Sequence, residues 1–265
     1  MSRLLVSILA GLVLCISDQR LPVQVVEAGT AEETFVSRNS SHFTVQFDGN
    51  EDHTVWSRVS EILEDAYRDI GRHLTYYPAK PIIVVLHTRE TFRDATGGPA
   101  WADGLYDPLL GRIKIPTQGA LTDQAWLTRI LRHEYVHALV HIRMDGRGSI
   151  PTWLNEGLAL QLAGDPPPDF DTMRHSRVPL INLNKLDGPW GGFPQPLAHI
   201  AYLSGNSATK YFIDRYGMQK VREVLEALAT GQPFPDAMQD RLAITYEQFQ
   251  QRWIDELNAK LKAGQ

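Results

Sequence analysis

Cysteine is nearly absent from this chain of 265 residues: Cys15 is the only one, which excludes a disulfide-stabilised scaffold. Positive charge is not in excess, because 26 Lys and Arg stand against 31 Asp and Glu, and the net charge of −5 disfavours nucleic-acid binding. Long hydrophobic runs are missing too, since the longest, residues 4–16, falls short of the roughly 20 residues of a membrane-spanning helix. What remains, 43% hydrophobic and 22% charged residues, is the composition of a globular protein with a sizeable core.

The N-terminus has the pattern of an export signal. Arg3 precedes the apolar run 4–16, and polar residues follow from Ser17. We therefore expect residues 1–28 to be a signal peptide or N-terminal anchor, and the protein to be exported, whether periplasmic, bound to the cell envelope or secreted. Any membrane tether would lie in this segment alone. The alternative to a cleaved signal peptide is that residues 1–28 stay attached, either as an uncleaved anchor or as a buried N-terminal helix.

Beyond a polar linker at 29–41, the first half of the chain mixes strand and helix patterns. Period-two alternation and β-branched runs predict strands, and apolar residues at helical spacing predict one helix of some five turns. The predicted elements are a strand at 42–47, a helix at 56–74, and strands at 81–86, 101–106 and 112–115. The last two strands flank a turn and are expected to pair.

From residue 122 the pattern is helical almost to the end. Helices are predicted at 122–144, 151–162, 197–216, 218–230 and 246–262. Residues 164–194 hold three consecutive prolines and a Gly-rich stretch, so an irregular connection is expected there. The fold class is therefore α+β: one domain, residues 42–262, with an α/β lobe at 42–145 and a helical lobe at 150–262.

Residues 133–137 read His-Glu-Tyr-Val-His, an H-E-x-x-H pattern whose spacing has a physical reason. Residues four apart lie on one helix face with β-carbons about 6 Å apart, so His133 and His137 can bind one Zn²⁺. Glu134 then lies beside the metal, within reach of a bound water but not as a ligand. Two incidental histidines are the alternative, but unliganded imidazoles on the apolar stripe of this helix would be costly to bury.

A catalytic zinc site needs a third protein ligand and one open position. His141 continues the same face, but eight residues of helix rise about 12 Å from His133, too far to share one ion. The metzincin pattern is absent, because position 143 is an arginine instead of a histidine. Glu156, on the next predicted helix, can return to complete the site. The other candidates further along the chain are Asp145, Asp165 and His175.

Together these residues resemble a known family, the gluzincin zinc peptidases. Eighteen residues separate His137 from Glu156, and residues 153–157 read Trp-Leu-Asn-Glu-Gly, with Ala159 two positions later. The chain is similar to the peptidase MA-like group and, more distantly, to the M1 aminopeptidases, over residues 42–217. The resemblance implies a small β-sheet packed on the zinc-binding helix, a mainly helical lobe after it, and an active site in the cleft between them.

The resemblance also implies roles for individual residues. It implies a zinc-dependent metallopeptidase with one catalytic zinc ion, held by His133, His137 and Glu156. Glu134 would be the general base that takes a proton from a metal-activated water as it attacks the peptide carbonyl. M1 enzymes stabilise the oxyanion with the tyrosine of a Tyr-x-x-Gly pattern, which occurs here at Tyr202, so Tyr202 is the candidate oxyanion donor.

The sequence departs from these relatives in two places. Nothing upstream resembles the Gly-x-Met-Glu-Asn segment with which M1 enzymes bind a free amine, so aminopeptidase specificity is not implied. The aspartate that follows the glutamate ligand by four residues in thermolysin-like enzymes is Leu160 here, which leaves the group that orients His133 unassigned. Relatives pair an extended peptide with a strand edge, which corresponds here to residues 104–115. His175 and His199 are expected on the surface, and Trp126 and Trp153 in the core.

These observations favour an exported zinc peptidase that acts on a peptide or protein. One alternative is a binding or regulatory protein that keeps the fold without turnover, and another is a zinc hydrolase of a non-peptide amide in the cell envelope. The presence of Glu134 together with all three ligands argues against the first. Cleavage of an unstructured protein, blocked by a chelator, would separate the peptidase from both.

Overall fold

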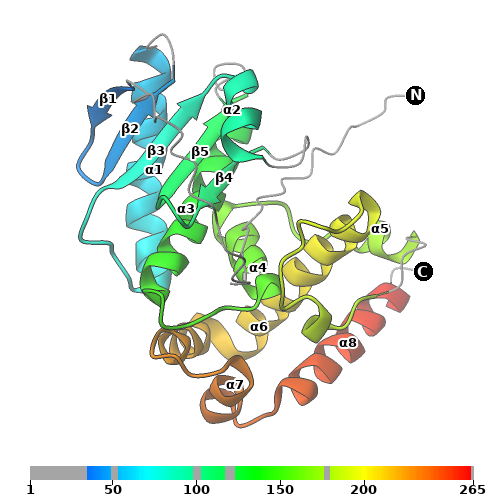
Figure 1. Cartoon of the computed structure of the whole chain (residues 1–265). Helices are drawn as coiled ribbons and strands as arrows, with labels where there is room; N and C mark the ends of the chain where they lie inside the picture. Colours follow the sequence, from blue (N-terminus) through cyan, green and yellow to red (C-terminus); the bar gives the residue numbers. More distant parts are fainter. Residues whose placement is uncertain (1–34, 49–52, 98–102, 117–122, 176–179, 264–265) are drawn as a thin grey trace, which may run out of the picture.

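The computed structural model describes residues 35–48, 53–97, 103–116, 123–175 and 180–263. These residues form one β-sheet with its covering helices, followed by a mainly helical half (Figure 1). The α+β class expected from the sequence is confirmed. The signal peptide or anchor expected at 1–28 lies outside the described residues, and N-terminal sequencing of the mature protein, expected to start between residues 18 and 35, remains its test. Among the described helices, none is long and apolar enough to cross a membrane.

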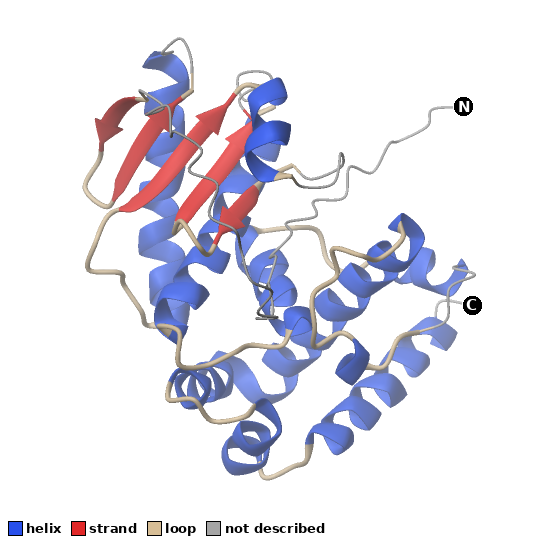
Figure 2. Cartoon of the chain, in the orientation of Figure 1, coloured by secondary structure: helices blue, strands red, loops and turns tan. Residues whose placement is uncertain are grey.

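The sheet is mixed and has the strand order β1-β2-β3-β5-β4, which Figure 2 shows in red. Its strands are β1 (Val36–Asn39), β2 (Phe43–Phe47), β3 (Ile82–His87), β4 (Leu105–Asp107) and β5 (Arg112–Pro116). The three central strands are parallel, with Val45 beside Val84 and Val84 beside Ile113, while both outer strands are antiparallel to their neighbours. The expected pairing of the two strands around the 108–111 turn is confirmed.

The strand β1 corrects the sequence interpretation, which placed residues 36–39 in a polar linker. These four residues pair with β2, from Val36 beside Phe47 to Asn39 beside Thr44. None of them is buried, because β1 is an edge strand on the surface of the sheet. An exposed edge strand is held by backbone hydrogen bonds and carries no hydrophobic alternation from which it could be predicted.

Eight α-helices and one short 3₁₀ turn (Leu183–Lys185) occur in the described residues. The helices are α1 (His53–Leu74), α2 (Arg89–Thr96), α3 (Gln124–Met144), α4 (Thr152–Ala163), α5 (Phe170–His175), α6 (Gln195–Ala229), α7 (Phe234–Leu242) and α8 (Tyr246–Ala263). The longer helices match the predicted ones to within three residues at each end. The sequence pattern does not predict α2, α5 and α7, because six to nine residues are too few to show a helical period.

Helices cover both faces of the sheet. On one face Phe43 contacts Tyr67 of α1 and Tyr135 of α3 edge-on, so both helices pack there. On the other face the amine of Lys114 donates to the carbonyl oxygen of Ala95 in α2. The core between the sheet and α1 and α3 continues into the helical half. Trp153 lies within this core and Trp126 packs against it, as expected.

α6 contains the break that the sequence predicts between two helices at 197–216 and 218–230. Gly217 has φ 81° and ψ 156°, which lie outside the helical region and in one that glycine adopts readily. The helix therefore kinks at this residue instead of ending. Tyr202, the candidate oxyanion donor, lies before the kink, in the segment that packs on α4.

Candidate metal centre

The middle of α3 is buried on all sides. Asp123 accepts a hydrogen bond from the backbone N–H of Trp126 and caps the start of the helix, while Asp145 ends it in the left-handed conformation. Every residue from 133 to 140 is buried. One side of this stretch packs on the sheet, and the side that carries His133 and His137 faces α4.

α4 carries the candidate third ligand and is buried along almost its whole length. Two glycines bring it close to α6. A β-carbon on Gly157 would lie 2.0 Å from Oγ1 of Thr209, and one on Gly205 would lie 2.8 Å from the carbonyl oxygen of Trp153. Only residues without a side chain allow this approach. The close packing fixes Glu156 opposite the histidines of α3.

The three predicted ligands come together in one buried group. Nε2 of His133 lies 3.1 Å from Nε2 of His137, and Oε2 of Glu156 lies 3.4 Å from the first nitrogen and 3.5 Å from the second. Tetrahedral ligands at Zn–N distances of 2.0–2.1 Å are about 3.3 Å apart, so this spacing fits a zinc ion. Within the described part of the chain, this is the one group of three His, Cys, Asp or Glu that could hold a metal.

The charges in this group favour a cation. Burial alone would lower the pKa of His137, but the charge of Glu156 outweighs it and raises the pKa to about 9. Burial would raise the pKa of Glu156, and His137 and His133 reverse that effect, so its pKa is lowered. The buried carboxylate therefore holds a proton on the imidazole, and a metal ion bound to the same nitrogen would replace that proton.

Glu134 lies in a different environment. It is fully buried, and burial raises its pKa above the ordinary value for a glutamate. The charge of Glu156 adds to the rise, while His137, His133 and the backbone N–H of Tyr106 act against it. The carboxyl next to the candidate ligands therefore binds a proton more readily than an exposed glutamate does.

Comparison with known protein families places this centre in context. The family model of the Peptidase MA superfamily matches residues 76–259, which include all three members of the buried group. The chain belongs to the Peptidase MA superfamily. The resemblance to gluzincin-like peptidases is thus confirmed, and the chain is a peptidase-type hydrolase. A comparison with curated proteins finds no match.

In this Peptidase MA domain, Tyr202 of α6 lies within the electrostatic reach of Glu156 and Glu134 of the candidate metal centre. Its side chain is buried, at 4% exposure, and its ring stands edge-on to Trp190, with the centroids 5.0 Å apart. Burial raises the pKa of the hydroxyl well above its ordinary value, and the charges of Glu156 and Glu134 act in the same direction. The hydroxyl therefore keeps its proton at neutral pH, where it can donate a hydrogen bond.

The remaining candidates lie outside the buried group. Asp145, His141 and His175 are exposed, which matches the expectation for His175. His199 is half-buried instead of exposed; burial lowers its pKa, and the charge of Asp169 opposes this. None of these side chains belongs to the group that could hold a metal.

The sequence assigns no role to two further groups at the centre. The side chain of Asn155 interacts with His137 and favours its protonated form. Its place directly before the glutamate ligand is a signal from which this contact could have been found. The backbone N–H of Tyr106 interacts with Glu134, and this depends on how β4 lies against α3. No local pattern in the sequence reveals it.

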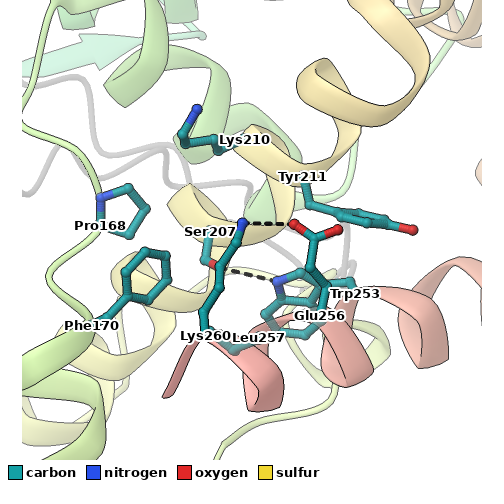
Figure 3. Close-up of a pocket in the computed structure, with 9 residues that line it drawn as sticks. All are labelled: Pro168, Phe170, Ser207, Lys210, Tyr211, Trp253, Glu256, Leu257 and Lys260. Carbon is teal, nitrogen blue, oxygen red and sulfur yellow. Dashed lines mark hydrogen bonds and ion pairs between the residues drawn. The ribbon is translucent and has the colours of Figure 1, made fainter. Parts of the chain in front are cut away.

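A separate pocket lies between α5, α6 and α8 (Figure 3). Aromatic side chains line it, together with two lysines, Lys210 and Lys260. Lys210 pairs with Asp214, and Lys260 pairs with Glu256, as Figure 3 shows for the second pair. Because the charged side chains of this pocket are paired with each other or with a neighbour, nothing in it indicates a ligand.

Proposed function

We propose that this Peptidase MA protein is a zinc-dependent peptidase that hydrolyses peptide bonds of a peptide or protein substrate. One zinc ion would be held by His133, His137 and Glu156. The observation that carries the proposal is the buried meeting of two Nε2 atoms and one Oε2 atom at 3.1–3.5 Å. Two imidazoles and a carboxylate are a donor set of catalytic zinc sites, which keep a fourth position open.

A zinc ion held by these three residues would act as a Lewis acid and make an attacking water molecule more acidic. Glu134 carries the proton in the proposed reaction. Its carboxylate accepts a proton from the attacking water and gives it to the nitrogen of the leaving amine. The raised pKa of Glu134 supports this double role, because a group whose pKa lies closer to the working pH both accepts and releases a proton.

Tyr202 stabilises the oxyanion in the proposed reaction. Its hydroxyl donates a hydrogen bond to the carbonyl oxygen as negative charge develops there. Two observations support the role: the hydroxyl lies in the electrostatic field of both Glu156 and Glu134, and its pKa is raised, so it stays protonated. Packing against Trp190 restricts the ring and so limits the reorganisation that donation requires.

β4 provides the candidate edge for an extended substrate. It is the last strand in the sheet order, and its Tyr106 interacts through the backbone with Glu134. The edge and the proposed general base are therefore adjacent. A peptide that pairs with this edge would have its main chain close to the metal centre.

The test is degradation of casein by purified protein, with and without a zinc chelator. We expect cleavage by the wild type, loss of cleavage with the chelator, and recovery when zinc is added back. E134Q protein, purified in the same way, controls for a contaminating protease. A zinc-loaded wild type that leaves casein intact would contradict the proposal and favour a binding protein or a hydrolase of non-peptide amides.

A further inference from the structure

Both histidine ligands of the proposed zinc site have an Nδ1 atom without a hydrogen-bond partner in the described residues. Nε2 of both His133 and His137 faces Glu156, so the proton of each neutral ring belongs on Nδ1. A metal-binding histidine usually donates that N–H to an acceptor. The side chain of Asn155 lies close enough to His137 to favour its protonated form, although neither Oδ1 of Asn155 nor Nδ1 of His137 has a hydrogen-bond partner in the described residues. Nδ1 of His133 is buried and has no hydrogen-bond partner in the described residues.

A second buried group without a partner lies where α4 ends. Gly164 has φ 83° and reverses the chain, and the backbone N–H of Asp165 then bonds to the carbonyl oxygen of Leu160 at 3.2 Å. The side chain of Asp165 is only 7% exposed. Its Oδ2 atom is buried without a hydrogen-bond partner in the described residues. Such an orphaned oxygen is rare in a stable fold and calls for an explanation.

Two side chains of α3 interact with this carboxylate. Arg129 and His133 are four residues apart and share one face of the helix. Nε of Arg129 lies 4.0 Å from Oδ1 of Asp165. Burial raises the pKa of Asp165, and the charges of His133 and Arg129, in that order, oppose the rise. Oδ1 of Asp165 therefore pairs with Arg129, and Oδ2 is available for another hydrogen bond. The carboxylate also lies within the electrostatic reach of His133.

We propose that Asp165 is the positioning residue of His133. Its Oδ2 accepts the hydrogen bond of Nδ1–H of His133 through one bridging water molecule, since no direct hydrogen bond joins the two atoms, while Arg129 balances the charge at Oδ1. The inference rests on the zinc site proposed above. Leu160 occupies the position four residues after Glu156 and is apolar, so it cannot accept this hydrogen bond. In this proposal Asp165, which follows the end of α4, provides the carboxylate in its place.

A carboxylate at Nδ1 fixes the orientation of the ring and makes Nε2 a stronger ligand, and its removal typically lowers metal affinity about 10–100-fold. The zinc affinity of metal-free protein, measured by competition with a chromogenic chelator, is therefore the readout. We expect D165A to bind zinc about 10–100-fold more weakly than the wild type. D165N keeps an acceptor but loses the charge, so its affinity should fall between the two.

D171N is the matched control. Asp171 lies six positions further along the same connection and is 78% exposed at its side chain, so the substitution removes a nearby negative charge without touching His133. We expect its zinc affinity to equal that of the wild type. An equal loss in D171N and D165N would overturn the proposal, because the effect would then come from net charge alone.

Thermal unfolding of the metal-free variants separates positioning from packing. If Asp165 only supports the fold, D165A unfolds at a lower temperature but binds zinc with wild-type affinity while folded, and the proposal is overturned. If D165A does not fold, D165N decides, and wild-type affinity in D165N overturns the proposal. A wild type that binds no zinc would overturn the zinc site as well, so failure of the two ideas can be told apart.

Discussion

At the residue scale, Glu134 and Glu156 are the same chemical group, almost equally buried, with pKa values that move in opposite directions. Burial raises the pKa of both. Only Glu156 has two imidazole nitrogens within 3.5 Å, and these reverse the effect. When the pKa values of two neighbouring carboxyl groups are shifted in opposite directions, the group with the lowered pKa is suited to bind a cation. The group with the raised pKa is suited to exchange a proton.

Replacing Glu134 by glutamine should abolish turnover and leave zinc bound. The amide has nearly the same shape, so the packing of α3 is preserved, but it cannot accept a proton. General acid–base catalysis typically contributes about 10²–10⁴-fold, so we expect kcat to fall by at least about 10²-fold. The check is kcat and zinc content on one preparation of E134Q. Wild-type kcat with zinc bound would contradict the role of Glu134.

Replacing Tyr202 by phenylalanine should lower kcat by about 10²–10³-fold, the usual effect of losing one oxyanion donor. Zinc content and KM should change little, because the hydroxyl acts on charge that develops only in the transition state. Steady-state kinetics of Y202F on a single substrate, beside its zinc content, checks this. An unchanged kcat would leave Tyr202 as a packing residue against Trp190.

At the element scale, the close contact of α4 with α6 holds Glu156 in place. We expect G157A to lower the free energy of unfolding by about 1–3 kcal/mol, as overpacking does, because its methyl group would meet Thr209 and the backbone of Gly205. Gly188 faces open space, so G188A is a control expected to stay within about 0.5 kcal/mol of the wild type. Denaturant unfolding measures both. Wild-type stability in G157A would contradict the proposed tight packing.

The sequence predicts the long helices of this fold better than its short helices and its edge strand. α1, α3, α4 and α8 are long enough to show a helical period, so their places follow from the pattern. The candidate ligands were predictable because His133 and His137 share one face of a helix, and because the resemblance to gluzincin peptidases implies Glu156. The proposed role of Asp165 toward His133 is not local, since it depends on how the end of α4 meets α3. The edge strand β1 was missed because exposed residues leave no hydrophobic signal.

At the scale of the whole molecule, Arg132 connects three helices next to the candidate metal centre. From α3 it donates to Oδ2 of Asp69 in α1 at 2.6 Å and to the carbonyl oxygen of Leu162 in α4 at 2.8 Å. It directly precedes His133 in the chain. The interaction thus ties the helix that carries the histidines to the helix that carries Glu156.

This connection gives a pH-dependent contribution to stability. The hydrogen bond from Arg132 lowers the pKa of Asp69 below its ordinary value of 3.8. A carboxyl with a lowered pKa in the folded state stabilises the fold above its unfolded pKa and loses that effect as the pH falls. D69N should therefore be less stable than the wild type at neutral pH, by at most about 1 kcal/mol for a partly exposed pair, and the difference should shrink as the pH falls below 3.8 and vanish below the lowered pKa of the folded state.

Thermal unfolding of the wild type and D69N across this pH range measures the effect. D65N is the control, because Asp65 lies on the same helix and pairs only with the exposed Arg68 among the described ion pairs. The unfolding temperature of D65N should differ little from that of the wild type at every pH. A constant gap between D69N and the wild type at every pH would contradict the linkage.

The central claim is that His133, His137 and Glu156 together hold a zinc ion. Metal analysis of purified protein after dialysis against zinc-free buffer tests it most directly, with the wild type, E134Q and E156A compared side by side. We predict about one zinc per chain in the wild type and in E134Q, because Glu134 is not a ligand, and a large loss in E156A, because two ligands bind zinc far more weakly than three. Full zinc in E156A, or none in the wild type, would contradict the account.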